Sequence, residues 1–375
     1  MMIIAEAGTS HGGSLDMGFK LIEKAADSGA DCIKFQAVFA DEIVHPLSGK
    51  VTLPGGKISL YDEFKQLEKG EEFFTKLKQE AEKCGLIFLA TPFGIKSAQM
   101  LKNMDVSMMK IASPELNHFS LLEEVSKYGI PLILSGGVSM LSDIEKAVEI
   151  TGRGITFLHC VTSYPAPEED YNLLLIKTLS SVFGFKTGVS DHSKDPLLVP
   201  LISAALGASA LEKHITLDNT AGGLDDLIAL NPADFKMMTE EIRKIESLEA
   251  ASGAAGETPV TTGTSAASDR GKVNKTLLEE LEKRFGSARV NSITGDGIKR
   301  LAPSEKGNYR TTNRSLLALR TIESGETLGE NDFAPLRSEK NLLPGLTPDF
   351  ARIITGKTVR KKIENGTGIT FEYLL

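Results

Sequence analysis

Apolar and polar positions follow two patterns that alternate regularly along the first 250 residues. Short runs rich in β-branched residues predict buried strands, and the segments between them carry apolar residues at helical spacing. Strands are expected at 2–6, 32–36, 87–91, 108–112, 131–135, 155–160, 187–190 and 210–214, and the last helix at 232–248. Eight strand–helix repeats predict a closed (β/α)8 TIM barrel. An open doubly wound sheet is the alternative, but no GxGxxG motif follows the first strand.

The expected carboxyl ends of these strands are polar, and this is the edge where a barrel of this kind places its chemistry. Lys34 and Lys110 both fall there. Because a buried lysine needs an anionic partner, the two favour a small substrate with two anionic groups, such as a phosphate ester that also carries a carboxylate. Structural ion pairs with Glu6, Glu115 or Glu212 are the alternative.

His192 and His214 end the last two expected strands, in GVSDHS and ALEKHITLD, and the segment between them is long enough for one crossover helix. If these strands are parallel neighbours, both imidazoles emerge at one edge. Ser190, Asp191, Glu212 and Asp225 are near them in the sequence, which predicts an acidic, imidazole-rich pocket suited to a divalent metal. For either histidine alone, the alternative is a satisfied core or surface position.

The long connection from 37 to 72 is a candidate lid over the barrel mouth, since long loops in compact domains are commonly functional. A packing or oligomer contact is the alternative. After residue 248 the composition changes to small and polar, as in a flexible linker. One charged helix is expected at Lys275–Phe285, then an irregular stretch to about Asn313. The expected domains are therefore a barrel at 1–250, a linker and insert with one helix at 251–312, and a small β-rich module at 313–375, with strands at 315–318 and 369–373.

Composition narrows the function classes. The formal net charge of -8 and the scattered Lys and Arg argue against a nucleic-acid surface. The start, MMIIAEAGTSHGG, has neither a basic lead nor an apolar run that would cross a membrane, so a cytoplasmic protein is expected. The three cysteines, Cys32, Cys84 and Cys160, are expected to be reduced core thiols, none with an activating base beside it.

Six motifs together resemble those of the sialic acid (N-acetylneuraminate) synthases, or nonulosonate synthases: AEAGTSHGG, GADCIKFQA, MKIASPELNH, LHCVTSYPAP, GVSDHS and ALEKHITLD. A tail resembling antifreeze proteins follows, in RSLLALRTIESGE and GKTVRKKIENGT. The resemblance covers roughly residues 1–250 and 313–375. It implies a (β/α)8 barrel joined to a small β-clip antifreeze-like (SAF) domain in a domain-swapped homodimer. It also implies condensation of phosphoenolpyruvate with an N-acylated amino sugar.

The resemblance also implies roles for matching residues. His192 and His214 would hold a divalent ion, typically Mn²⁺, with Mg²⁺ or Co²⁺ as alternatives. The groups that would hold phosphoenolpyruvate are Lys34, Thr91, Lys110, Ser135 and Ser190, and those that would face the sugar are Gln36, Thr162, Tyr164 and Asp225. Glu115 or Glu212 would orient or deprotonate water at the reacting carbons. Arg337 would reach the sugar in the partner subunit. Four features depart from the family's usual pattern: Ser10, Gly136, Thr162 and the interval between Arg337 and Pro344. These departures leave the identity of the sugar substrate undetermined.

Two other functions fit parts of the pattern. A barrel metallohydrolase would use the same metal, but it normally needs more histidines and a bridging carboxylate. A non-catalytic sugar-binding or assembly protein would not need the full set of lysines, histidines and carboxylates.

Overall fold

The computed structural model describes residues 1–53, 56–253, 273–339 and 341–374. Eight parallel strands close into a barrel in the order β1, β10, β9, β8, β7, β6, β5, β2. These strands are β1 (Met2–Gly8), β2 (Cys32–Ala37), β5 (Ile87–Pro92), β6 (Met109–Ile111), β7 (Leu132–Ser135), β8 (Thr156–Cys160), β9 (Lys186–Asp191) and β10 (Ala210–His214). The predicted TIM barrel is confirmed, and the open sheet is excluded because β1 pairs with both β2 and β10.

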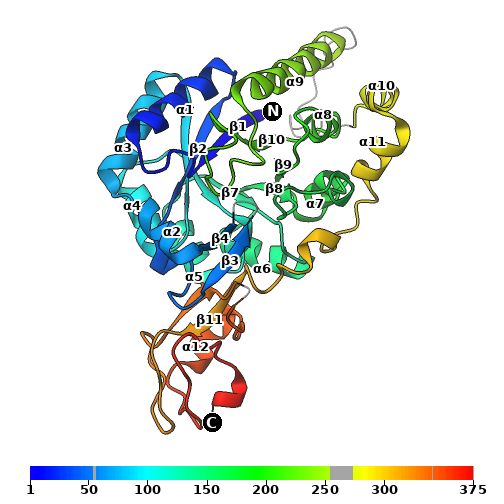
Figure 1. The fold of residues 1–375 in the computed structure, drawn as a ribbon. Helices are drawn as coiled ribbons and strands as arrows, with labels where there is room; N and C mark the ends of the chain where they lie inside the picture. The colour runs from blue at the N-terminus through cyan, green and yellow to red at the C-terminus, as the bar shows by residue number, and fades with distance from the viewer. Residues whose placement is uncertain (54–55, 254–272, 340, 375) are drawn as a thin grey trace.

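Helices surround the barrel (Figure 1). They are α1 (Leu15–Asp27), α3 (Glu71–Lys83), α4 (Ile95–Asn103), α5 (Phe119–Ser126), α6 (Leu141–Thr151), α7 (Leu175–Phe183), α8 (Leu198–Ala205) and α9 (Pro232–Gly253). Ser14 begins α1 by accepting a hydrogen bond from the Met17 N–H, as an N-cap serine does. A Cβ at Gly18 would lie 2.5 Å from a methyl carbon of Leu77, so glycine at position 18 leaves room for the Leu77 side chain between α1 and α3.

Side chains inside the barrel form an apolar layer beneath a polar one. The apolar layer is a buried cluster of Ile4, Cys32, Leu89, Ile133, Leu158 and Ala210. Successive side chains of a strand point to opposite faces, so residues two positions further on return to the barrel interior. Those residues are Glu6, Lys34, Thr91, Ser135, Cys160 and Glu212, and all of them are buried. The strand pattern therefore stacks polar groups towards the carboxyl end of the barrel.

The connection after β2 is not a structureless loop. It contains an antiparallel hairpin of β3 (Lys50–Leu53) and β4 (Gly56–Ser59), followed by α2 (Leu60–Leu67). Phe64 packs with Val38, Ile43, Val44 and Phe93 in a buried cluster of their own, which stabilises the connection against the barrel. Its role as a lid stays a prediction.

The segment after the barrel differs from expectation. Helix α9 ends at Gly253 rather than at 248, so the first residues of the expected linker are helical, and 254–272 lie outside the described residues. The structure has α10 (Lys275–Phe285) and a second helix, α11 (Ser287–Thr294), where an irregular stretch was predicted. That prediction was wrong because only two residues of α11, Val290 and Ile293, are buried, too few to produce a visible helical pattern.

The C-terminal module has its own apolar core, which includes Leu316, Ile322, Val359 and Ile369. β11 (Arg314–Ala318) pairs antiparallel with β12 (Phe333–Arg337), a strand that Pro335 concealed in the sequence. The strand expected at 369–373 was wrong, since Phe371–Tyr373 forms a 3₁₀ turn. The module lies at the end of the barrel where β3 and β4 are also found (Figure 1). Within the described ranges, no helix combines the length and apolar character needed to cross a bilayer.

Candidate active site

Four charged residues meet inside the barrel at its carboxyl end. Lys34 on β2 lies 3.0 Å from Glu212 and 3.3 Å from Glu6, measured from its Nζ to a carboxylate oxygen of each. Lys110 on β6 lies 3.3 Å from the same Glu212 carboxylate. All four side chains are at least 95% buried. The sequence predicted either an anionic ligand or structural ion pairs for the lysines, and the pairs with Glu6 and Glu212 are present.

This cluster divides its carboxylates into two kinds. Burial alone would raise the pKa of Glu212, but Lys110 and Lys34 hold it well below its ordinary value. Burial raises the pKa of Glu6 from 4.5 to about 7, despite Lys34 nearby. Burial also lowers the pKa of Lys110 from 10.5 to about 8. Glu212 is therefore a fixed anion, whereas Glu6 titrates near neutral pH, a property that the sequence did not predict.

Hydroxyl groups surround the lysines. Ser190 on β9 donates a hydrogen bond to Glu212 at 2.8 Å. Thr91 Oγ1 on β5 and Ser135 Oγ on β7 are buried and have no hydrogen-bond partner. Buried hydroxyls are normally satisfied, so unpaired ones are candidates for ligand contacts. Two cations beside two unpaired hydroxyls form a cradle for an anionic ligand.

The two histidines lie together, as their positions at adjacent strand ends predicted. The ring centroids of His192 and His214 are 5.5 Å apart, and Tyr164 stacks on His192 at 4.4 Å. His192 Nδ1 lies 2.9 Å from the Val161 carbonyl. Because a carbonyl can only accept, Nδ1 carries a proton, and Nε2 is the nitrogen that would bind a metal once it has lost its own proton.

The chemistry around the pair favours a cation. Burial and the neighbouring His192 hold the pKa of His214 well below 6.5, which keeps its lone pair available. Burial alone would lower the pKa of His192, yet Cys160, Val161 and Glu212 raise it to about 9, so these surroundings favour positive charge. His214 also lies 3.8 Å from the Asp225 carboxylate. The described residues contain no group of three or more His, Cys, Asp or Glu side chains arranged as metal ligands. A divalent ion held by the two imidazoles would leave its other positions to water and substrate.

Residues assigned to the sugar border the histidines. Gln36 donates a hydrogen bond to Glu6 at 2.9 Å. A Cβ at Gly8, which has φ +54°, would lie 3.3 Å from Gln36 Nε2 and 3.7 Å from Asp225 Oδ2, so the two side chains flank this glycine. Burial raises the pKa of Asp225 from 3.8 to about 6. Gln36, Tyr164 and Asp225 are thus gathered on one side of the mouth.

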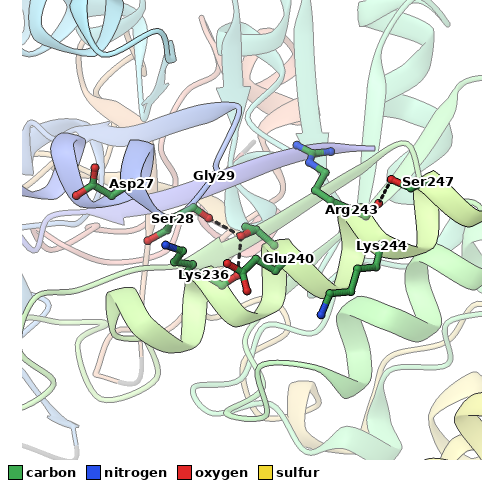
Figure 2. A pocket seen from close by; sticks show the side chains of 9 residues that line it. Asp27, Ser28, Gly29, Lys236, Glu240, Arg243, Lys244 and Ser247 are labelled. Carbon is green, nitrogen blue, oxygen red and sulfur yellow. Dashed lines mark hydrogen bonds between the residues drawn. The ribbon is translucent and has the colours of Figure 1, made fainter.

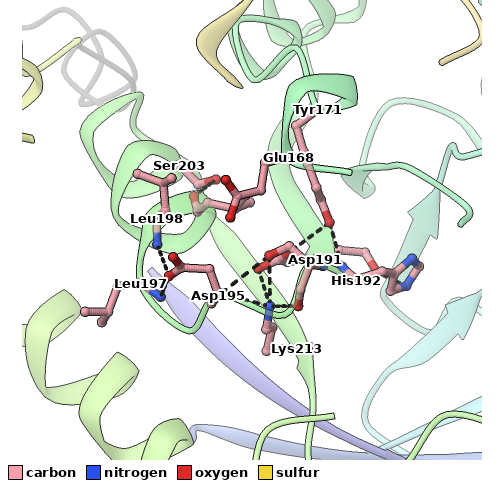
Figure 3. Close-up of polar contacts among 12 residues, drawn as sticks. Glu168, Tyr171, Asp191, His192, Asp195, Leu197, Leu198, Ser203 and Lys213 are labelled. Atoms are coloured by element: carbon pink, nitrogen blue, oxygen red, sulfur yellow. Dashed lines mark hydrogen bonds and ion pairs between the residues drawn. The ribbon is translucent and has the colours of Figure 1, made fainter. Parts of the chain in front are cut away.

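One neighbour of the histidines was misplaced at the sequence level. Asp191 was expected in the metal pocket, but it points to the outer side of the barrel and pairs with Lys213 at 2.6 Å. Tyr171 donates to Asp191 at 2.6 Å and accepts from the His192 N–H at 2.7 Å (Figure 3). The alternation of a strand explains this, because Asp191 and Lys213 each precede an inward-facing histidine.

His159 and Cys160 at the end of β8 also differ from expectation. His159 is a polar residue near the end of its strand, but its side chain contacts the Tyr171 carbonyl, on the outer side. Cys160 points inward, and its Sγ lies 3.8 Å from His192 Nδ1. Burial alone would raise the pKa of this thiol, but His192 lowers it. The expectation that no cysteine has a base beside it was therefore wrong for Cys160, although all three cysteines are free as predicted.

Glu115 lies in a different environment from the one expected. One carboxylate oxygen pairs with Arg314 and the other with Arg337, both from the C-terminal module of the same chain. Burial alone would raise the pKa of Glu115, but the two guanidinium groups hold it below its ordinary value. A carboxylate whose two oxygens are both ion-paired is a poor proton acceptor. Glu115 instead fastens the C-terminal module to the barrel, with Arg314 completely buried between them.

A second groove lies away from this site. Figure 2 shows it at the amino-terminal end of the barrel, where its lining residues are Asp27, Ser28, Gly29, Lys236, Thr239, Glu240, Arg243, Lys244 and Ser247. Arg243 binds Asp31 with two hydrogen bonds of 2.7 Å, and Thr239 contacts the Ser28 carbonyl. These contacts hold α9 against the barrel, so the residues of the groove serve stability.

Comparisons of sequence and of structure with known proteins relate this chain to one family. Residues 21–253 match the NeuB family, and residues 313–375 match the SAF domain. The N,N'-diacetyllegionaminic acid synthase of Campylobacter jejuni is 31% identical over 96% of this chain and 97% of its own length. The crystal structure of the spore coat polysaccharide biosynthesis protein SpsE of Bacillus subtilis has a TM-score of 0.79 and 32% identity, and covers 100% of this chain and 95% of that chain. The N-acetylneuraminic acid synthetase of Leptospira borgpetersenii, solved with citrate, has a TM-score of 0.59 and 34% identity, and covers 77% of this chain and 93% of that chain.

Proposed function

Because this chain belongs to the NeuB family, we propose that it is a nonulosonic acid synthase that condenses phosphoenolpyruvate with an N-acylated amino sugar. The products are a nine-carbon 2-keto acid and phosphate. The sugar is N-acetylmannosamine or a diacetamido-dideoxy hexose. The observation that carries the proposal is the cradle of Lys34 and Lys110 beside the unpaired hydroxyls of Thr91 and Ser135, together with two imidazoles whose centroids are 5.5 Å apart.

Phosphoenolpyruvate occupies this cradle. Its phosphate and carboxylate contact the side chains of Lys34, Lys110, Thr91, Ser135 and Ser190. Two buried cations offset the charge of both groups, and they continue to stabilise the phosphate as it leaves. The citrate found in the Leptospira relative is also a small polyanion, which supports an anion site in this family.

His192 and His214 would hold a divalent cation, with Mn²⁺ as the first choice and Mg²⁺ or Co²⁺ as alternatives. When bound, such an ion polarises the open-chain aldehyde of the sugar as a Lewis acid. The sugar is oriented so that its aldehyde carbon faces the methylene carbon of phosphoenolpyruvate. The residues that orient it are Tyr164, Gln36, Asp225 and Thr162. Orientation of two reactants in this way is a large part of the rate enhancement that an enzyme supplies.

The chemistry then follows from electron flow. The enol carbon attacks the aldehyde carbon, the aldehyde oxygen gains a proton, and carbon 2 of the pyruvyl unit becomes oxocarbenium-like. Water adds to carbon 2 and gives up a proton. As the tetrahedral intermediate collapses, the carbon–oxygen bond to phosphate breaks, the proton of the carbon 2 hydroxyl passes to the departing phosphate, and the ketone remains.

We assign the proton transfer from water to Glu6. Glu115 and Glu212 were the expected bases, but their ion pairs hold both of their pKa values below the ordinary range. Glu6 has a pKa of about 7 and an Oε2 atom without a hydrogen-bond partner. A general base is most effective when its pKa is near the working pH.

A phosphate-release assay tests the function. Phosphoenolpyruvate, Mn²⁺ and a panel of N-acylated hexosamines are supplied, and we expect sugar-dependent consumption of phosphoenolpyruvate. The product mass then identifies the sugar. Hydrolysis of amides or esters without consumption of phosphoenolpyruvate would instead indicate the metallohydrolase, and sugar binding without turnover would indicate the assembly protein.

The domain-swapped homodimer stays a prediction. In this chain Arg337 pairs with Glu115 of its own barrel. Mixing inactive His214→Ala and Arg337→Ala chains tests the exchange of C-terminal modules. Recovered activity would support exchange between subunits, whereas no recovery under exchanging conditions would match the pairing within one chain.

A further inference from the structure

Residues 299–313, here called the strap, join α11 to the C-terminal module and bind two loops of the barrel mouth. Asn308 donates a hydrogen bond to the Thr162 carbonyl at 3.2 Å, in the loop after β8. Asn313 donates to the Val138 carbonyl at 3.2 Å, in the loop after β7. Lys299 reaches the Gly136 carbonyl at 3.3 Å. This part of the expected insert, to which the sequence assigned no chemistry, therefore contacts both loops.

Glu305 is at the centre of the strap. Its Oε1 accepts hydrogen bonds from the Val138 N–H at 2.7 Å and from the Thr162 N–H at 2.8 Å. Its Oε2 accepts from the Ala302 N–H at 3.2 Å, within the strap itself. The residue is only 1% exposed. One buried carboxylate oxygen thus joins the loops after β7 and β8, and bonds to an ionised acceptor are stronger than neutral ones.

The loop after β7 needs this support. Val138 has φ +42°, a region that a β-branched residue occupies only when its surroundings hold it there. The strap bonds both the N–H and the carbonyl of Val138, through Glu305 and Asn313. A Cβ at the neighbouring Gly137 would lie 2.0 Å from Thr162 Oγ1. The two loops therefore fit together in one arrangement, and the strap fixes it.

We propose that Glu305 is a positioning residue that sets the relative placement of Ser135, which precedes the first loop, and Thr162 in the second. Glu305 acts through backbone amides and touches no reactant. The identity of the ligands that these loops bind rests on the proposed function, in which Ser135 contacts phosphoenolpyruvate and Thr162 faces the sugar.

The first test is independent of activity. Glu305→Gln keeps the size of the side chain but removes the charge, and Lys306→Gln, at the exposed next position, is the matched control. Hydrogen exchange followed by mass spectrometry should show amides of the loops at 136–138 and 161–163 exchanging about tenfold faster in Glu305→Gln, as expected when bonds to a charged acceptor weaken. Asn308→Ala, which removes only the bond to Thr162, should affect the second loop alone. Unchanged exchange in both loops, or faster exchange throughout the barrel, would overturn the proposal.

The second test is kinetic. Displaced loops weaken substrate binding, so Glu305→Gln should raise the KM for phosphoenolpyruvate about tenfold and change kcat much less. A loss of folded enzyme would instead lower apparent kcat at constant KM, and that result would contradict positioning. If the wild-type protein shows no sugar-dependent consumption of phosphoenolpyruvate, the proposed function fails, while the exchange experiment still decides the role of Glu305.

Discussion

Lys213 Nζ lies 2.6 Å from Asp191 Oδ2 on the outer side of β10 and β9, and both side chains are completely buried. The next residues along these strands are His192 and His214, which point into the barrel. Lys213 also donates hydrogen bonds to the Ser193 carbonyl and hydroxyl, so the same ammonium group holds the loop that follows His192. The outer faces of these strands thus fix the position of the inner imidazoles, as the outer partners of metal ligands do in other proteins.

Tyr171→Phe should weaken metal binding without unfolding the protein. The hydroxyl that it removes bonds both Asp191 and the His192 N–H. We expect a loss in Mn²⁺ affinity of about tenfold or more, measured by calorimetric titration. Tyr309→Phe is the control, because it removes a hydroxyl that contacts Asp143 instead. Equal affinities in the two variants would show that the Tyr171 network does not orient His192.

Glu6→Gln should remove one limb of the pH–rate profile. Glu6 has a pKa of about 7 and is a base only when deprotonated, so wild-type kcat/KM should rise with pH through about 7. The variant should lose this limb together with about 10²–10⁴ in rate. Asp225→Asn is the control, since the pKa of Asp225 is about 6 and the limb near 7 should persist. If the limb near 7 survives in Glu6→Gln, another group is the base.

Lys110→Ala should raise the KM for phosphoenolpyruvate far more than the KM for the sugar. Removing one buried cation from the cradle costs about 2 kcal/mol or more, so the KM for phosphoenolpyruvate should rise about 30-fold or more. Steady-state kinetics with each substrate varied in turn measures the difference. Lys127→Ala removes an exposed lysine that pairs with Glu124, and it should change neither constant. Equal increases for both substrates would contradict the role of Lys110.

Stability should fall as the pH drops below about 6.5. Burial lowers the pKa of His118 and of His159 to about 3, and that of His11 to about 4. All three are neutral in both states above pH 7, but below 6.5 the unfolded chain binds protons that the folded chain does not. The free energy of unfolding should therefore decline between pH 6.5 and about 4, by about 1.4 kcal/mol per pH unit for each histidine.

Urea unfolding of the wild type and of His118→Asn, at several values of pH, measures this decline. Asparagine can replace the histidine as the N-cap of α5, where His118 accepts from the Leu121 N–H. The decline in the variant should be less steep than in the wild type by about 1.4 kcal/mol per pH unit, the contribution of one histidine. An unchanged slope would mean that His118 does not remain neutral in the folded state.

The sequence was sufficient for the parts of the fold and site that follow from local pattern. Strand–helix alternation predicted the barrel, and the positions of Lys34, Lys110, Glu212 and the two histidines at expected strand ends predicted that they would meet at its carboxyl end. Prediction of secondary structure from the sequence was less reliable where apolar residues are sparse, as in α11, or where a proline hides a strand, as in β12.

Tertiary structure alone decided which partner each charge has, because those partners are far apart in the chain. Glu115 was a candidate base by motif, but Arg314 and Arg337 make it a structural anion. Glu6 became a titrating group through burial beside Lys34, and Glu305 joined two loops more than a hundred residues before it. Alternation along a strand is a local property that can be read from neighbouring residues, whereas desolvation and ion pairing depend on contacts that exist only after the barrel closes.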